Sequence, residues 1–563
     1  MSGYLAIIAE IDKSTIIRKL FDDSELIIRP LNSQLCLFYY STSQTFSGGR
    51  LFQGYAIDHE RQAIIFSGAK NSQLPRPSTP IDGSYFTAEL SDSQATFGAD
   101  LNGYVPMCWF NSRSVTAISD SYLSLVNLRT ALGLPCSINP ETVAGRMWMN
   151  SMAYQQLGTK TFCKEVSICT PGTTLSFSYE TRMLHELPAN LPKQYETAIE
   201  SHADAIHQAA ARMIGVIKGY AESGGLVSLS LSGGMDSRAC LAAALRAGIG
   251  DSLFVGSKDN GRADYPIARE LAERFGFQLN RSSRVLQGTL APRDPLTTWS
   301  AMSLGLYDAL YASDKFRRLD RPVFAVGGQG AEISKGNYGW RQLTKINMPR
   351  QALAQASEGL TRIGVDKDDK WGSEWHYLAF RNAIHGGRGL LNSDYISRPA
   401  AQVPIIGLSR SELNEFPAPR KGQYNVIGDL LVCLNPQLAL HRFDSHAKDF
   451  TPERLERRLK AIGGPIAESE IPDYSSIGSA TPSAGILKSH VSCAENLGFA
   501  GGANGATLWP FAERSIKEFR ELIDPDVISL AKQIPANDRT AISSQSKEGT
   551  ALSKLVALSP LTL

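Results

Sequence analysis

The first third of the chain alternates short apolar runs with polar turns, and this pattern is typical of β-strands. We predict strands over Leu5–Ile11, Leu35–Tyr40, Ala63–Ser67, Gly83–Leu90 and Ser114–Ile118. A helix should begin after Asn139, because Asn is a favoured N-cap and Pro140 suits the first helical position. Residues 1 to about 190 are therefore predicted to be rich in β-structure.

The pattern changes after Leu187–Ser201, a polar, proline-containing stretch that we interpret as a linker. Strands are predicted over Leu226–Leu231, Leu253–Gly256 and Pro322–Val326, and helices over Arg238–Ala247 and Asp264–Gly276, the second capped by Asp264. This alternation predicts a parallel sheet that binds ligand at the carboxyl ends of its strands. Beyond about residue 345 we expect mostly helices and long loops. The fold class is therefore α/β, with domains over residues 1–190 and 200–563.

Composition and charge narrow the function classes. The 563 residues carry 57 basic and 55 acidic side chains, a net charge of +2, which disfavours nucleic acid as the main partner. No apolar run reaches the roughly 18 residues that a membrane helix needs, and Met1–Glu10 predicts a strand rather than a signal peptide. The 8 cysteines form no Cys-x-x-Cys pair, so we expect neither a disulfide framework nor a zinc site. We expect a cytoplasmic protein without a membrane partner.

The most informative motif lies between the strand Leu226–Leu231 and the helix that follows. Two glycines let backbone N–H groups converge, and a helix N-terminus favours an anion such as pyrophosphate. Two hydroxyls add hydrogen bonds, whereas Asp236 suits a magnesium ion that bridges phosphates. We predict an ATP and Mg²⁺ site at Leu231, Ser232, Gly233, Gly234, Asp236 and Ser237. The alternative is a tight turn without a ligand.

The string Ser-Gly-Gly-X-Asp-Ser resembles the PP-loop of ATP pyrophosphatases, which cleave ATP between its α and β phosphates. Further segments are similar to the asparagine synthetase superfamily. Asp82–Phe86 resembles its "DGxF" strand, Gly327–Tyr338 resembles "SGEGxDELFGGY", and similar strings lie at 118–127, 138–144 and 166–176. The resemblance implies an N-terminal Ntn-hydrolase-like α/β/β/α sandwich. It also implies a C-terminal synthetase domain with a Rossmann-like parallel sheet and extra helices.

The resemblance also implies roles for residues near the nucleotide. Aligned by its glycines, the second string puts Glu332 on a magnesium-binding acid, so that Asp236 and Glu332 would share one metal; the alternative is a surface acid. The backbone at Val255 would hold the adenine. Gly327 and Gly328 would line the ribose and the α-phosphate.

The resemblance also implies two further catalytic positions. Gln329 sits where asparagine synthetases have Glu and β-lactam synthetases have Tyr, and an amide side chain cannot act as a general base. Ser544–Lys554 resembles the loop that carries the family's late lysine, so Lys547 would place a positive charge on the transition state. The alternative for Lys547 is an exposed tail lysine.

The start of the chain departs from the glutamine-dependent members, which begin Met-Cys-Gly. Here the residues are Met1, Ser2 and Gly3. A serine with a free N-terminal amine could serve as a nucleophile, yet the glutamine-binding strings are not visible either. We therefore expect that glutaminase activity is lost, that this half is a scaffold or a substrate platform, and that the amine comes from another source.

These features predict an ATP- and magnesium-dependent synthetase that adenylates a carboxylate and joins it to an amine. The chain looks most like a lasso-peptide macrolactam cyclase, whose substrate is a small peptide and whose partner would be a leader-removing protease. Alternatives are a β-lactam-forming synthetase and an ammonia-dependent amidotransferase acting on a small molecule or a polysaccharide. A non-catalytic binding protein and a tRNA-modifying PP-loop enzyme are rivals from other classes.

Overall fold

The structure is a computed structural model. It describes residues 3–21, 26–41, 45–196, 198–259, 261, 263–281, 288–292, 294–311, 315–391, 393–417, 424–482 and 486–562. Among these residues no helix is long and apolar enough to cross a membrane.

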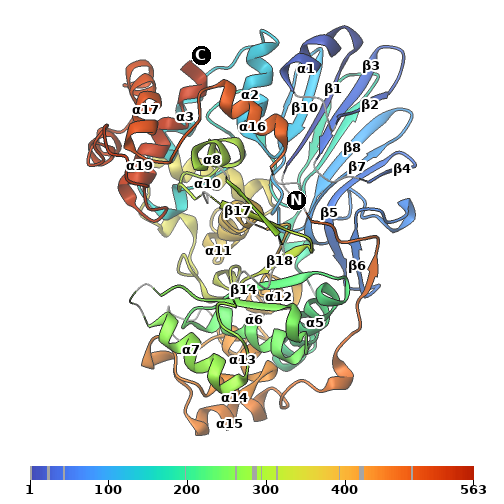
Figure 1. The fold of residues 1–563 in the computed structure, drawn as a ribbon, viewed down its shortest axis with the longest axis vertical. Helices are drawn as coiled ribbons and strands as arrows, with labels where there is room; N and C mark the ends of the chain where they lie inside the picture. Colours follow the sequence, from blue (N-terminus) through green and yellow to red (C-terminus); the bar gives the residue numbers. More distant parts are fainter. Residues whose placement is uncertain are drawn as a thin grey trace.

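Two sheets dominate the N-terminal half (Figure 1). The first has the order β11-β9-β10-β1-β3-β2, with β1 (Tyr4–Glu10), β2 (Leu26–Pro30), β3 (Leu35–Ser41), β9 (Cys108–Asn111), β10 (Val115–Ser119) and β11 (Ser167–Ile168). The second has the order β13-β12-β8-β7-β5-β6-β20, with β4 (Thr45–Ser47), β5 (Arg50–Asp58), β6 (Ala63–Phe66), β7 (Asp82–Leu90), β8 (Gln94–Ala99), β12 (Thr174–Ser178), β13 (Leu184–Leu187) and β20 (Ser475–Ile477). Strand β4 pairs with β5 at its side. All five predicted strands are confirmed within one or two residues of their bounds.

The two sheets share a core of alternating side chains, in which Tyr4 of β1 stacks on Phe86 of β7 with ring centroids 3.7 Å apart. Helices share one hydrophobic core with the other face of the first sheet. These are α1 (Ser14–Leu20), α2 (Tyr122–Ala131), α8 (Pro295–Ser303), α16 (Lys488–Asn496), α17 (Gly505–Phe519), α18 (Pro525–Ala531) and α19 (Lys547–Val556). Helix α2 contacts the sheet and α16 packs beside α2, whereas α17, α18 and α19 pack mainly on one another (Figure 1).

The helix predicted after Asn139 is confirmed as α3 (Pro140–Arg146), and the Asn139 side chain accepts a hydrogen bond from Thr142 N. Whether a domain boundary lies between residues 190 and 200 stays a prediction. Strand β20 joins the second sheet beside β6 although it lies far along the sequence.

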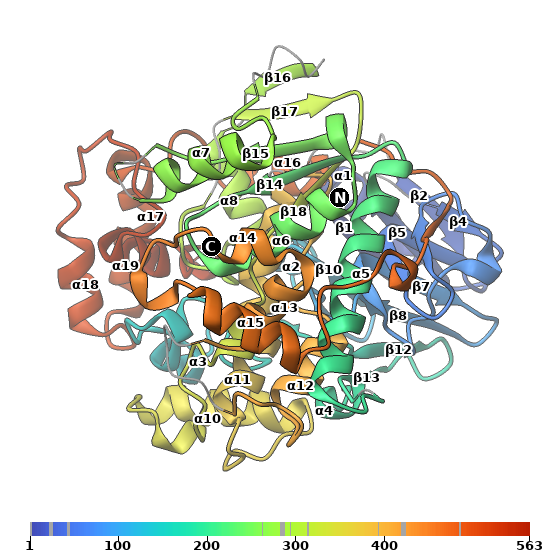
Figure 2. The ribbon, with the colours of Figure 1, turned by 90° about the horizontal axis from the view of Figure 1, so that it is seen from below.

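A four-stranded parallel sheet forms the other part of the molecule, in the order β15-β14-β18-β19. Its strands are β14 (Leu226–Ser230), β15 (Leu253–Gly256), β18 (Val323–Val326) and β19 (Tyr395–Ser397). Around it pack α5 (His202–Glu222), α6 (Met235–Arg246), α7 (Asp264–Phe275) and α13 (Val426–Leu434). Helix α5 contacts both β14 and β6, so it lies between this sheet and the β-rich half (Figure 2). The α/β class and the parallel sheet are confirmed.

The remaining segments are mostly helical, which confirms the prediction for the chain beyond about residue 345. They include α4 (Leu191–Gln194), α9 (Glu332–Lys335), α10 (Arg350–Arg362), α11 (Gly372–His376), the π-helix η7 (Tyr377–His385), η8 (Arg388–Leu391), α12 (Val403–Ser409), α14 (Pro436–Ala439) and α15 (Pro452–Ala461). A two-stranded ribbon joins β16 (Gly288–Pro292) to β17 (Lys315–Leu319).

Candidate functional site

An open cavity with a volume of about 460 Å³ lies at the carboxyl ends of β14 and β18. Two short segments, one after each strand, supply its floor. Seven of the predicted site residues line it together: Ser232, Asp236, Ser237, Gly327, Gly328, Gln329 and Glu332. A cavity therefore lies at the strand ends, where the sequence predicts a ligand site.

The turn after β14 is held by its own hydroxyl groups. Ser232 Oγ and Ser237 Oγ are 2.9 Å apart, and Ser232 N donates to Ser237 Oγ over 3.1 Å. Helix α6 then begins with Gly234 as N-cap, which has no side chain to accept from the first-turn N–H groups. An anion in the cavity is the natural partner for N–H groups of this kind.

Gly328 lets the segment after β18 approach the start of α6. A Cβ at this position would lie 2.6 Å from Asp236 Cβ and 2.7 Å from Ser237 N. Only glycine fits at such a separation, so the two strand ends are held close enough to share one ligand.

The cap prediction for Asp264 is wrong. The N-cap of α7 is Ala263, and Asp264 instead accepts a hydrogen bond from Gly233 N over 2.6 Å. Because Asp264 sits in the first turn of α7, its carboxylate reaches across to the turn after β14. We expected Asp264 to cap its own helix, but its carboxylate instead binds the backbone of the turn that follows the neighbouring strand.

Arg238, in the first turn of α6, ties this helix to the segment that follows α14. It is fully buried and donates to the carbonyl oxygens of His441 and Arg442, over 2.6 and 2.8 Å. Its guanidinium lies 3.7 Å from the centroid of the Phe443 ring. The segment after α14 is thereby tied to the helix that begins at the cavity.

Two carboxylates of the cavity lining, Asp236 and Glu332, lie close to the ammonium of Lys335. Lys335 Nζ contacts Asp236 Oδ2 in an ion pair, and Glu332 Oε2 accepts from Gly330 N over 2.9 Å. Burial raises the pKa of Glu332, the charge of Asp236 raises it further, and Lys335 opposes the rise. Lys335 escaped the sequence analysis, although its place three residues after Glu332 puts both on one face of a helical turn.

Asp236 and Glu332 fit a magnesium site. Asp236 Oδ1 is buried and has no hydrogen-bond partner among the described residues. The described part of the chain gathers no group of three or more Asp, Glu, His or Cys side chains as a metal site. A metal held by these two carboxylates would therefore take its other ligands from phosphate and water, as magnesium does.

Two arginines also line the cavity, and the sequence analysis did not identify either of them. Arg398 follows β19 and donates to the carbonyl oxygens of Ala325 and Gly386, over 3.0 and 3.2 Å. Arg388 stacks on the Tyr311 ring, 3.9 Å from its centroid, and no carboxylate pairs with it in the described part of the chain. Arg388 is thus a cation that an anionic substrate could bind.

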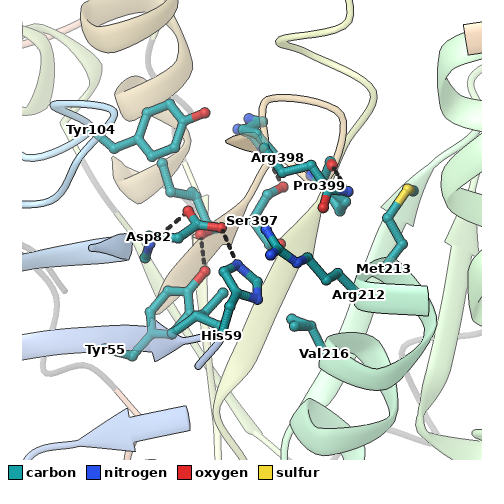
Figure 3. Close-up of a pocket in the computed structure, with 14 residues that line it drawn as sticks. Tyr55, His59, Asp82, Tyr104, Arg212, Met213, Val216, Ser397, Arg398 and Pro399 are labelled. Carbon is teal, nitrogen blue, oxygen red and sulfur yellow. Dashed lines mark hydrogen bonds and ion pairs between the residues drawn. The ribbon is translucent and has the colours of Figure 1, made fainter. Parts of the chain in front are cut away.

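A second and much smaller cavity, of about 20 Å³, lies at the seam between the β-rich half and the parallel sheet (Figure 3). Asp82 and Gly83 of the "DGxF"-like string line it, and His59 Nε2 lies 3.4 Å from Asp82 Oδ2. Arg212 points into it from α5, and Arg398 lines this cavity as well as the larger one. Arg398 therefore connects the two halves of the molecule at the site.

The structure does not bring the other predicted residues to the cavity wall. Lys547 is exposed at the start of α19, which packs on α17 and α18 at a distance from β14 and α6 (Figures 1 and 2). Its expected place at the transition state is therefore not supported, because packing of the last helices carries it elsewhere. Val255 is buried, and its carbonyl accepts from Asn280 N over 2.9 Å. Leu231, Gly233 and Gly234 belong to the strand end and the turn but do not line the cavity.

Met1 and Ser2 lie outside the described residues. Near them, Tyr4 N donates to Asp120 Oδ1, which also lies 2.9 Å from His490 Nε2. A Cβ on Gly3 would come within 2.7 Å of Leu487 Cβ, so the segment that leads into α16 covers this end of β1.

No model of a known protein family matches the sequence, and a comparison with curated proteins found no match. Membership of the asparagine synthetase superfamily accordingly stays an inference from the strings and from the residues that the cavity brings together.

Proposed function

We propose that the protein is an ATP- and magnesium-dependent synthetase that adenylates a carboxylate and joins it to an amine. One observation carries the proposal. At the ends of two neighbouring parallel strands, the glycine turn over residues 232–237, which carries Asp236, and the segment that carries Glu332 line one cavity together. In this proposal the parallel sheet is a PP-loop domain of the asparagine synthetase type, and the two N-terminal sheets are a degenerate Ntn-hydrolase-like sandwich.

The cavity offers groups for each part of the nucleotide. The hydroxyls of Ser232 and Ser237 and the first-turn N–H groups of α6 suit the β and γ phosphates. Gly327 and Gly328 leave room beside the α-phosphate. Asp236 and Glu332 would hold magnesium, which neutralises phosphate charge when bound. The cavity volume of about 460 Å³ lies within the range of typical small-ligand pockets, roughly 300–1,000 Å³.

The proposed reaction has two steps. A carboxylate oxygen of the substrate attacks the α-phosphorus, the bond from this phosphorus to the bridging oxygen breaks, and pyrophosphate leaves into the turn. An amine nitrogen then attacks the acyl carbon, AMP leaves, and the amine loses a proton. Arg388 would orient the carboxylate, so the contribution of the protein is mainly position and charge. Gln329 cannot accept the proton, which passes to another group.

Within this class we propose closure of a macrolactam in a peptide, between its α-amine and an Asp or Glu side chain. Two observations disfavour glutamine as the source of the amine. Residues 1–3 include no cysteine that could liberate ammonia from glutamine, and the segment leading into α16 covers the neighbouring Gly3. An ammonia-dependent amidotransferase is the competing outcome of the test below.

The test measures pyrophosphate release from Mg-ATP together with the mass of the acceptor. Linear core peptides containing Asp or Glu form one arm, and aspartate with ammonia forms the other. A peptide product about 18 Da lighter, one water lost on amide closure, supports the macrolactam cyclase. Turnover with aspartate and ammonia alone excludes that substrate. Asp236→Ala should abolish release, whereas Asp92→Ala, an exposed acid in a turn of the N-terminal half, should not change it.

A further inference from the structure

We propose that Lys335 is a resident cation of the carboxylate pair and keeps free divalent metal out until metal arrives together with the nucleotide. Lys335 lies in the last position of α9, and Glu332 lies in the first, so both side chains extend from the same face of one helical turn. Asp236 comes from the first turn of α6, on the other side of the glycine contact. Three charges from two elements therefore converge on one point.

The ion pair occupies a ligand that the metal needs. Lys335 Nζ binds Asp236 Oδ2, which leaves Oδ1 as the remaining oxygen of that carboxylate. A lysine beside a carboxylate is charged at neutral pH. The positive charge of Lys335 repels a divalent cation that approaches the carboxylate pair to contact distance.

The balance of charge changes when the nucleotide binds. With all three side chains ionised, Asp236, Glu332 and Lys335 carry a net charge of −1, half of what would balance a divalent ion. Removal of the ammonium leaves two carboxylates, which match one divalent ion in charge. Phosphate oxygens offer Lys335 an alternative partner, so that it can release Asp236 as the metal enters. The place of Lys335 in the ATP reaction rests on the proposed function, whereas its effect on metal binding does not.

The test compares metal binding with catalysis. Binding of Mn²⁺ without nucleotide is measured from the loss of the free-ion signal in electron paramagnetic resonance. We expect weak binding by the wild type and binding at least about tenfold tighter, with one ion per chain, by Lys335→Met. Asp236→Asn added to Lys335→Met should remove the gain. Lys335→Arg should behave as the wild type. Lys345→Met, a change at an exposed lysine ten residues on, should have no effect.

Pyrophosphate release should move in the opposite direction and fall about tenfold or more in Lys335→Met, because the phosphates lose a cation. A merely structural ion pair would lower both metal binding and activity, together with the melting temperature. The proposal is overturned if Lys335→Met binds Mn²⁺ no more tightly than the wild type, or if the nucleotide-free wild type already binds it tightly. If no carboxylate supports pyrophosphate release, the proposed function fails, while the Mn²⁺ comparison still decides the role of Lys335.

Discussion

Replacing Gly328 with alanine would place one methyl group against the first turn of α6. The added Cβ would lie 2.6 Å from Asp236 Cβ and from the Asp236 carbonyl carbon, and 2.7 Å from Ser237 N. Two of these three atoms belong to the backbone, so no side chain can turn away to make room. The backbone of Gly328 itself lies outside the left-handed region, and alanine is allowed there by its own φ.

The size of the effect follows from these distances. Ordinary contact begins near 3.4 Å, so the segment after β18 and the start of α6 must separate by about 0.8 Å. Overpacking of this kind destabilises a protein by about 1–3 kcal/mol. A displacement of about 1 Å in a catalytic constellation can lower the rate about 100-fold. We therefore expect Gly328→Ala to retain its fold and to lose between about 30- and 100-fold in pyrophosphate release.

The assay is pyrophosphate release at saturating Mg-ATP, with thermal unfolding of the same preparations. Gly372→Ala is the matched control, since its Cβ would come no closer than 3.3 Å, to a flexible Leu360 methyl. This control should stay within about twofold of the wild type. A Gly328→Ala variant with full activity and an unchanged melting temperature would refute the argument that the two strand ends form one site.

Three further predictions test other parts of the structure. Arg388→Met should raise the KM of the carboxylate substrate about 10- to 100-fold, by loss of a charged hydrogen bond, with the KM of ATP unchanged in the same assay. Arg238→Met should lower the free energy of unfolding in urea by about 2–4 kcal/mol, because buried carbonyl oxygens lose their donor; a change below about 0.5 kcal/mol would contradict this. Burial lowers the pKa of Lys554 to about 8, although its buried partner Asp308 opposes the shift. Between that value and the unfolded pKa of about 10.4 the unfolded chain binds more protons. The free energy of unfolding measured at pH 8 and pH 10 should therefore rise with pH in the wild type relative to Lys554→Met, and a flat difference would count against it.

The parallel sheet and the turn after β14 could be predicted because their signals are local. Apolar runs of strand length, each closed by Gly or a polar residue, marked β14, β15 and β18. The glycine turn followed by a helix-forming run marked the start of α6. The fourth strand of the parallel sheet, β19, has only three residues, too few to form a recognisable pattern. Arg398, just after this strand, was therefore not predicted as a site residue.

Other features depend on contacts between distant segments, which no local pattern reports. Strand β20 pairs with β6 across some 400 residues of sequence, and His490 in α16 reaches Asp120 at the end of β10. For Lys547, a local pattern suggested a position that the packing of distant segments does not give. A string similar to a catalytic loop suggested a place at the cavity, but the position of that lysine is set by the packing of α19 on α17 and α18. Asp264 was likewise expected to cap its own helix, but it accepts a hydrogen bond from Gly233 N, which is distant in sequence.

The central claim is that the turn after β14 binds the pyrophosphate end of ATP, and calorimetric titration tests it without knowledge of the acceptor. Mg-ATP and Mg-pyrophosphate should each bind at one site per chain, and each should displace the other. Ser237→Ala should weaken both by about tenfold, the loss of a hydrogen bond to a charged group. Absence of binding by either ligand, or equal affinity in the wild type and in Ser237→Ala, would contradict the account.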